Sequence, residues 1–202
     1  MAERVKLLGL ALAGLLAATG ATGRALSAAA CPACAAALAP PAYEWAARTA
    51  GVPPSVLFAV AREESGLPLR GRWVPWPWTL NVAGAPQRFA TRTAACAALK
   101  QALESVPSHR IDVGLGQIDV GYYGDWVSSP CELLDPYRNL LLTATLLRGH
   151  HEPGEDWMVA IGRYHRPAGG ALAAQYRREV GAQLARVLAA VNTSPASEAS
   201  PP

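Results

Sequence analysis

The segment VLFAVAREESG, residues 56–66, places two adjacent carboxylates at the end of an apolar helical pattern. At about 100° per residue, Leu57 and Val60 share one face of the expected helix, and Glu64 falls in the middle of that face. Glu63 falls at its edge. A carboxylate on a buried face is costly unless it is paired, hydrogen-bonded or protonated, and a raised pKa suits a general acid near neutral pH. The pattern therefore indicates Glu64 as a general acid, and the alternative is that both glutamates lie on a solvated helix end.

Proline and glycine residues mark the ends of this helix. Pro53 and Pro54 open it, because proline suits the first helical turn, and Gly66 and Pro68 end it. Helical spacing predicts further helices over residues 43–49, 91–105, 136 onward after an Asp-Pro capping pair, 155–164 and 171–191.

The segment between the helix that carries Glu64 and the helix predicted over residues 91–105 is not helical. Pro75 and Pro77 exclude a helix interior over residues 67–90, so we expect extended segments with a short β-hairpin around residues 83–85. Gly114 and Gly116 indicate a turn or a short strand over residues 112–118. The predicted fold class is mainly α, with a short extended or β insertion after the helix that carries Glu64.

Composition limits the classes of function. The chain has 202 residues, 16 % of them charged, and a formal net charge of +3. Residues 1–30 hold three basic residues and one acidic residue, so the rest of the chain is near +1. Nucleic-acid binding needs a concentrated basic face, so we expect no nucleic-acid partner.

Residues 1–30 have the features of a secretory signal peptide. Two basic residues precede an apolar run from Leu7 to Ala18, and small residues follow it. The run is shorter than a membrane span of ~20 residues. The pattern predicts export to the periplasm with cleavage near Ala28 or Ala30. An uncleaved membrane anchor and a lipidated Cys31 stay open as alternatives.

The chain has four cysteines, and an even number in an exported protein favours disulfides. Three connectivities are open, of which we favour Cys96–Cys131 together with Cys31–Cys34. The histidines and cysteines lack the spacing of a zinc site, so we expect no metal.

Four short blocks follow one another along the chain: Glu64–Gly66, Gly114–Ile118, Asp135–Leu140 and Ala160–His165, with Tyr176 after them. In this order they resemble the lytic transglycosylase family with the goose-lysozyme-like SLT domain, most closely its small members from conjugation, secretion and pilus systems. The resemblance spans about residues 42–188. It implies a lysozyme-like catalytic domain at residues 42–190, between a lead-in segment at 31–41 and a disordered tail at 191–202.

The resemblance also implies a role for each matching residue. Glu64 matches the single catalytic acid and base. Ser65 matches the serine that places the carboxyl group or the substrate, and Asn139 matches an asparagine that braces the structure. Substrate-binding residues of the family correspond to Ser65, Gly114, Gly116, Gln117, Tyr164 and Tyr176. His165 departs from the family, which has asparagine there.

The implied reaction is cleavage of the β-1,4 bond between N-acetylmuramic acid and N-acetylglucosamine in peptidoglycan. A 1,6-anhydro product forms without a cofactor. The implied partners are glycan strands and components of a type IV secretion, conjugation or pilus machine. A hydrolytic lysozyme and a non-catalytic wall-binding component are the alternatives.

Two further sets of residues are open to more than one interpretation. Asp112 and Asp119 read as turn or cap residues, but one of them facing Glu64 would permit inverting hydrolysis. The tryptophans at positions 73, 76 and 78 could stack on sugars or pack as structural anchors.

Overall fold

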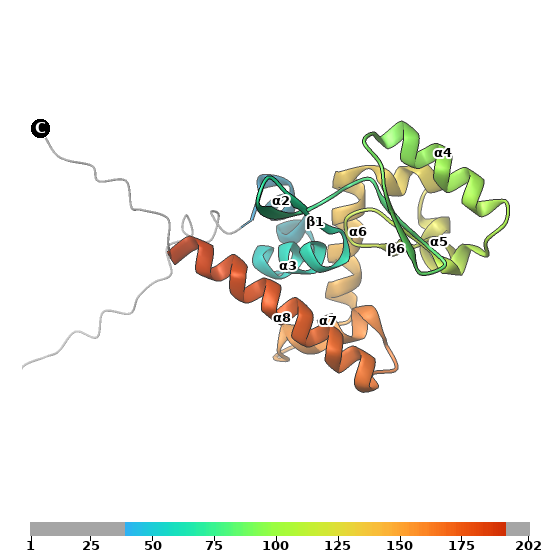
Figure 1. Ribbon diagram of the computed structural model, residues 1–202. Coiled ribbons are helices and arrows are strands. Elements are labelled where there is room, and N and C mark those ends of the chain that lie inside the picture. Colours follow the sequence, from blue (N-terminus) through green and yellow to red (C-terminus); the bar gives the residue numbers. More distant parts are fainter. Residues whose placement is uncertain (1–38, 193–202) are drawn as a thin grey trace, which may run out of the picture. The chain divides into compact units, whose positions relative to one another are not determined.

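The helix that carries Glu64, α3 (Pro54–Glu64), packs against the long C-terminal helix α8 (Gly170–Asn192) and against α2 (Pro41–Ala50). The computed structural model describes residues 39–192 (Figure 1). The predicted signal peptide, most of the lead-in segment, the Cys31–Cys34 pair and residues 193–202 lie outside the described residues. The described chain is mainly helical with a small antiparallel sheet, as the sequence predicts.

The first hydrophobic core forms where α3 meets the other long helices. Leu57 and Val60 are completely buried, which confirms the predicted apolar face of α3. They pack with Leu140 of α6 (Pro136–Gly149), Ile161 of α7 (Trp157–His165) and Val180 of α8. Complete burial of each such side chain contributes about 1.5–3 kcal/mol, so this core fixes the position of the end of α3.

The second core lies under a four-stranded antiparallel sheet of order β4-β3-β5-β6. Its strands are β3 (Thr79–Val82), β4 (Ala85–Arg88), β5 (Ile111–Val113) and β6 (Ile118–Asp119). One face of the sheet packs on α4 (Arg92–Leu103) and on the 3₁₀ segment η3 (Pro130–Leu134). The Cys96–Cys131 disulfide, one of the two pairings favoured from the sequence, joins α4 to η3.

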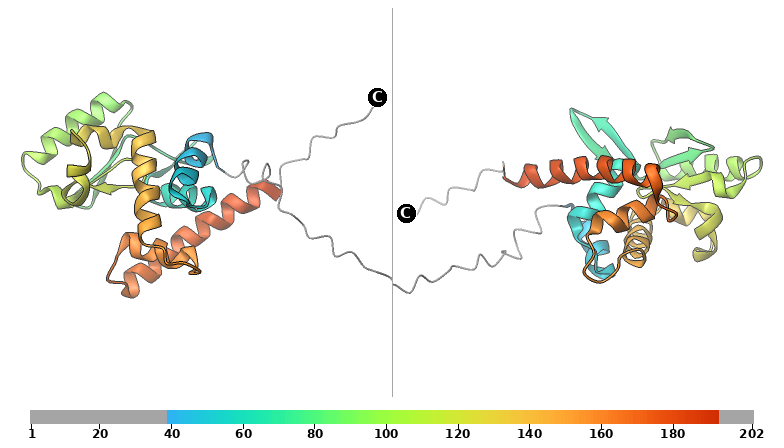
Figure 2. Two further views of the ribbon diagram at one scale, coloured as in Figure 1. Left: turned by 180° about the vertical axis from the view of Figure 1, so that it is seen from behind. Right: turned by 90° about the horizontal axis from the view of Figure 1, so that it is seen from below.

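Two hairpins form the extended insertion that follows α3. The first joins β1 (Gly66–Leu69) to β2 (Arg72–Pro75), and Figure 2 shows it projecting from the helices. The second joins β3 to β4 through Ala83 and Gly84, with φ of 54° and 90°, as expected for the tight turn predicted there.

Aspartate side chains cap the starts of two helices, and the cap at Asp135 was predicted. Asp135 accepts hydrogen bonds from the backbone N–H groups of Tyr137 and Arg138 at the start of α6, and Asp156 caps α7 through Met158. At the other end of the chain, α8 continues to Asn192, two residues into the segment predicted as a tail. No helix in residues 39–192 is long and apolar enough to span a membrane.

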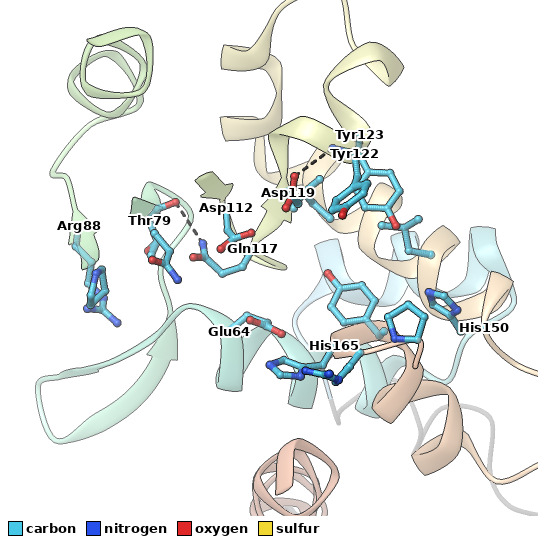
Figure 3. A pocket seen from close by; sticks show the side chains of 17 residues that line it. Glu64, Thr79, Arg88, Asp112, Gln117, Asp119, Tyr122, Tyr123, His150 and His165 are labelled. Atoms are coloured by element: carbon cyan, nitrogen blue, oxygen red, sulfur yellow. Dashed lines mark hydrogen bonds between the residues drawn. The ribbon is translucent and has the colours of Figure 1, made fainter. Parts of the chain in front are cut away.

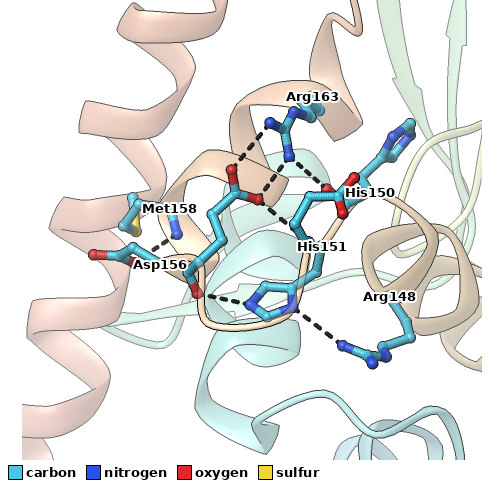
Figure 4. Close-up of polar contacts among 8 residues, drawn as sticks. Arg148, His150, His151, Asp156, Met158 and Arg163 are labelled. Carbon is cyan, nitrogen blue, oxygen red and sulfur yellow. Dashed lines mark hydrogen bonds and ion pairs between the residues drawn. The ribbon is translucent and has the colours of Figure 1, made fainter.

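An arginine holds the connection between α6 and α7 (Figure 4). Arg163 donates to both carboxylate oxygens of Glu155, at 2.6 and 3.0 Å, and to the backbone oxygen of His150. His151 bonds to the Glu155 backbone oxygen at 2.8 Å. This network fixes α7, whose last turn carries Tyr164 and His165.

Candidate active site

A cavity of about 690 Å³ opens between the exposed face of the four-stranded sheet and the ends of α3, α6 and α7 (Figure 3). The residues that shape it come from segments far apart in the chain: Glu64 from α3, Thr79 and Asn81 from β3, Arg88 from β4, Asp112 from β5, Gln117 and Asp119 around β6, and Tyr164 and His165 from α7. The volume falls within the range typical of ligand sites.

Glu64 is the last residue of α3, and its half-buried side chain borders the cavity. The pKa of Glu64 is raised to about 8, mainly by burial, and the charges of Asp112 and Glu63 contribute in the same direction. A hydrogen bond donated by the Tyr176 hydroxyl acts in the opposite direction by stabilising the carboxylate. At pH 7 the carboxyl group is therefore mainly protonated, which is the state that a general acid requires.

The neighbouring Glu63 has a different environment. It accepts a hydrogen bond from the Gln183 side-chain amide of α8 at 3.1 Å, and it is not among the residues that line the cavity. The two adjacent glutamates are thus separated by the helical rotation between them, as predicted from the apolar face of α3.

Tyr176 and His165 form a layer against Glu64. The Tyr176 ring is 4 % exposed, and the His165 ring stacks on it with centroids 4.5 Å apart and an interplanar angle of 17°. His165 itself borders the cavity. Burial lowers the pKa of His165, assisted by the nearby Arg166 and opposed by Glu179. His165 thus packs against the tyrosine that contacts Glu64.

The glycine loop between β5 and β6 is held from behind by Asn139 of α6. The Asn139 side chain accepts from the Gly116 N–H at 2.9 Å and donates to the backbone oxygens of Val113 and Leu133, both at 2.9 Å. Tyr164 donates to the Gly116 carbonyl at 2.5 Å. The predicted bracing role of Asn139 matches these contacts.

Three residues expected to bind substrate are not among those that line the cavity. A Cβ atom at Gly114 would collide with Asn139, and one at Gly116 with Thr143, so internal packing requires glycine at both positions. Ser65 is completely buried, and its hydroxyl lies 2.9 Å from the Leu115 carbonyl oxygen and 3.0 Å from that of Ala61. It therefore fastens the end of α3 to the glycine loop.

Gln117 is the residue of this loop that reaches the cavity. Its backbone adopts a left-handed conformation with φ of 48°, and its side-chain amide donates to the Gly114 carbonyl at 2.8 Å. The amide is thereby held along the cavity wall. Of the residues expected to contact substrate, Gln117 and Tyr164 line the cavity, whereas Tyr176 acts on Glu64 from a buried position.

The sheet contributes a row of polar residues, of which Asn81 was not singled out from the sequence. Asn81 pairs with Asp112, and Asp112 pairs with Asp119, so these three side chains lie side by side across β3, β5 and β6 and all border the cavity. Burial does not alternate strictly along β3, and β5 has only three residues, so alternation is too weak a signal to identify these residues from the sequence. Asp119 caps α5 (Val120–Tyr123), as predicted for a cap residue.

Asp112 is a strand residue, so its interpretation as a turn residue was wrong. The pKa of Asp112 is raised to about 6, mainly by burial and in addition by the adjacent charge of Asp119. Two like charges directly opposite each other on neighbouring strands destabilise a sheet. The pair Asp112 and Asp119, at the edge of a cavity, is therefore a candidate for a functional role.

The tryptophans after β1 are structural anchors. Trp76 and Trp78 pack edge to face with centroids 5.6 Å apart, and Trp76 donates to the Phe89 carbonyl. Trp73 donates to the backbone oxygen of Arg62. None of the three borders the cavity.

Comparisons with known proteins add no family assignment. No family model, no curated protein and no solved structure matches the chain. Among the described residues, no cluster of three or more His, Cys, Asp or Glu side chains could hold a metal ion.

Proposed function

We propose that this chain is a lytic transglycosylase that cleaves the glycan strands of peptidoglycan, with Glu64 as the only acid and base. The observation that carries the proposal is the position of the Glu64 carboxyl group at the cavity, where burial raises its pKa and the hydroxyl of Tyr176 is directed at it. A wall-binding protein without turnover has no use for a desolvated acid in this position.

In this reaction Glu64 donates its proton to the oxygen of the β-1,4 bond as the bond between that oxygen and C1 of N-acetylmuramic acid breaks. The acetamido group of the same sugar stabilises the developing positive charge. The C6 hydroxyl then bonds to C1 and returns its proton to Glu64, giving a 1,6-anhydro sugar. The Tyr176 hydroxyl stabilises the carboxylate that exists between the two proton transfers.

Hydrolysis is the second candidate, and Asp112 is the observation that favours it. Asp112 borders the same cavity, its charge acts on Glu64, and the pKa values of the two carboxyl groups are separated, at about 6 and about 8. A protonated acid and an ionised base on one cavity are what an inverting glycosidase needs to activate water.

The domain would be a lysozyme-like fold working in the periplasm, where it opens the wall for a conjugation, secretion or pilus apparatus. This part of the proposal rests on the family resemblance and on the N-terminal signal pattern.

The test is digestion of purified peptidoglycan by the wild-type protein, with mass spectrometry of the released muropeptides. Products ending in 1,6-anhydro-N-acetylmuramic acid support transglycosylation. Reducing-end products support hydrolysis, and the absence of released products supports the wall-binding alternative.

A further inference from the structure

Three aromatic side chains follow Asp119 on the segment that borders one end of the cavity: Tyr122, Tyr123 and Trp126, here called the aromatic platform. Asp119 accepts hydrogen bonds from the backbone N–H groups of Gly121 and Tyr122, at 2.7 and 3.1 Å, and so starts the short helix α5. The next turn, η2 (Gly124–Trp126), ends in Trp126. The backbone of the platform is therefore set by the same strand that lines the cavity.

The rings of the platform contact one another. Tyr123 and Trp126 meet edge to face with centroids 5.5 Å apart, and Tyr122 and Tyr123 are tilted with centroids 6.4 Å apart. Tyr123 also packs against the core beneath the sheet. Because the central ring is anchored, the outer two are held in place without being buried.

Tyr122 and Trp126 are unusually exposed for such large side chains. Their exposed fractions are 74 % and 58 %. Scattered exposed apolar residues need no explanation, but neighbouring exposed rings beside a cavity indicate a binding surface. An aromatic ring exposed in this way offers an apolar face for a ligand, with a polar tip that stays in water.

Position and charge select the class of ligand. Tyr122 and Tyr123 line the same cavity as Glu64, whereas Trp126 lies beyond its lining residues, so the platform continues the cavity outward. Residues 119–126 carry two aspartates and no lysine or arginine, which disfavours an anionic ligand. An uncharged ring with an apolar C–H face and hydroxyl groups at its rim, as in a pyranose, suits this surface.

We propose that the aromatic platform is a distal sugar-binding subsite, on which successive rings of a β-1,4-linked N-acetylhexosamine strand stack while the strand passes Glu64. Trp126 is its outermost residue, so it contacts only strands long enough to extend past the cavity. This inference rests on the proposed function for the identity of the strand. A subsite in this position makes the enzyme prefer long strands over short fragments.

The experiment separates binding from turnover. Isothermal titration calorimetry measures binding of the di- and hexasaccharide of β-1,4-linked N-acetylglucosamine to the Glu64→Gln protein, and to the same protein carrying Trp126→Ala. Loss of one stacked ring, at about 1.4 kcal/mol, corresponds to a tenfold rise in Kd. We expect a five- to tenfold rise for the hexasaccharide, no change for the disaccharide, and recovery in Trp126→Phe.

The chain offers a matched control. Trp45 is also an exposed tryptophan, 47 % exposed, with an edge-to-face tyrosine partner, Tyr137 at 5.9 Å, and it does not border the cavity. Trp45→Ala is expected to leave both Kd values unchanged.

The inference is overturned if the hexasaccharide binds with equal affinity with and without the Trp126 side chain. That result is expected if the platform instead receives a protein partner. The inference is also overturned by an equal loss for the disaccharide, an equal loss in Trp45→Ala, or no hexasaccharide binding by the Glu64→Gln protein. Failure of the proposed function is a separate result, namely that wild-type protein releases no products from peptidoglycan.

Discussion

The hydroxyl of Tyr176 on α8 donates a hydrogen bond to Oε1 of Glu64 on α3, joining two residues that are 112 positions apart in the chain. This contact forms only because α3 and α8 pack along one another with Leu57, Val60 and Val180 in their shared core. The helix packing therefore places the donor at a carboxyl group whose pKa is raised to about 8, mainly by burial. This pair is the basis of the first prediction.

Tyr176→Phe is expected to lower kcat and to raise the pKa of Glu64 further, because the phenol stabilises the carboxylate. A hydrogen bond to a charged group contributes about 1.5–3 kcal/mol, which corresponds to a loss of roughly 10- to 150-fold in kcat. The measurement is kcat against pH, where the alkaline decline moves to higher pH. Tyr137→Phe, in an exposed ring on α6, is the control, and an unshifted profile in Tyr176→Phe would argue against the assigned role.

Asp112→Asn distinguishes the two candidate reactions. If Glu64 is the only acid and base, activity stays within a few-fold of wild type. The alkaline decline then moves to lower pH, because the charge of Asp112 no longer raises the pKa of Glu64. If Asp112 activates water, the wild-type profile also falls below about pH 6 as Asp112 becomes protonated, and Asp112→Asn loses most of its activity. We expect the first result.

Asn139→Leu is expected to destabilise the fold. The substitution leaves the Gly116 N–H and the carbonyl oxygens of Val113 and Leu133 buried without their partner, at about 1–3 kcal/mol each. Chemical denaturation should show a loss of at least ~3 kcal/mol in the free energy of unfolding. Thr145→Ala, which removes an exposed hydroxyl from the same helix, should change it by less than about 0.5 kcal/mol. A loss below ~1 kcal/mol in Asn139→Leu would contradict the bracing role.

Glu64→Gln is expected to change how stability depends on pH. The pKa of Glu64 is about 8 in the folded state, against 4.5 for an unperturbed glutamate. Between these values the folded state keeps a proton that the unfolded state releases, so wild-type stability falls as pH rises from about 4.5 to about 8. The variant lacks this contribution and should gain several kcal/mol relative to wild type between pH 5 and pH 8. Urea unfolding at pH 5 and at pH 8 measures the free energy of unfolding of both proteins. A difference between the two proteins that is the same at both pH values would refute the prediction.

Local signals in the sequence predicted much of the fold. Two signals placed helices where the structure has them: the prolines and apolar periodicity of α3, and the cap Asp135 at the start of α6. Such determinants act within a few residues. The separation of Glu64 from Glu63 was predictable for the same reason, since it depends only on helical rotation.

The rest of the site depends on contacts between distant segments. Asp112 came to border the cavity through the register of β3, β5 and β6, which short strands with few alternating positions do not reveal. Gly114, Gly116 and Ser65 were expected at the substrate, but their neighbours are Asn139, Thr143 and Leu115. Sequence spacing cannot show which side of a loop faces solvent and which side faces the packed core.

The most direct test compares two adjacent glutamates in one assay. Purified peptidoglycan is digested with wild-type protein, Glu64→Gln and Glu63→Gln at equal concentrations, and 1,6-anhydro-muropeptides are quantified by mass spectrometry. We predict that Glu64→Gln releases none above background and that Glu63→Gln, whose carboxylate bonds to Gln183 away from the cavity, keeps most of the wild-type rate. Anhydro products from Glu64→Gln at the wild-type rate, or an inactive Glu63→Gln beside an active Glu64→Gln, would contradict the account.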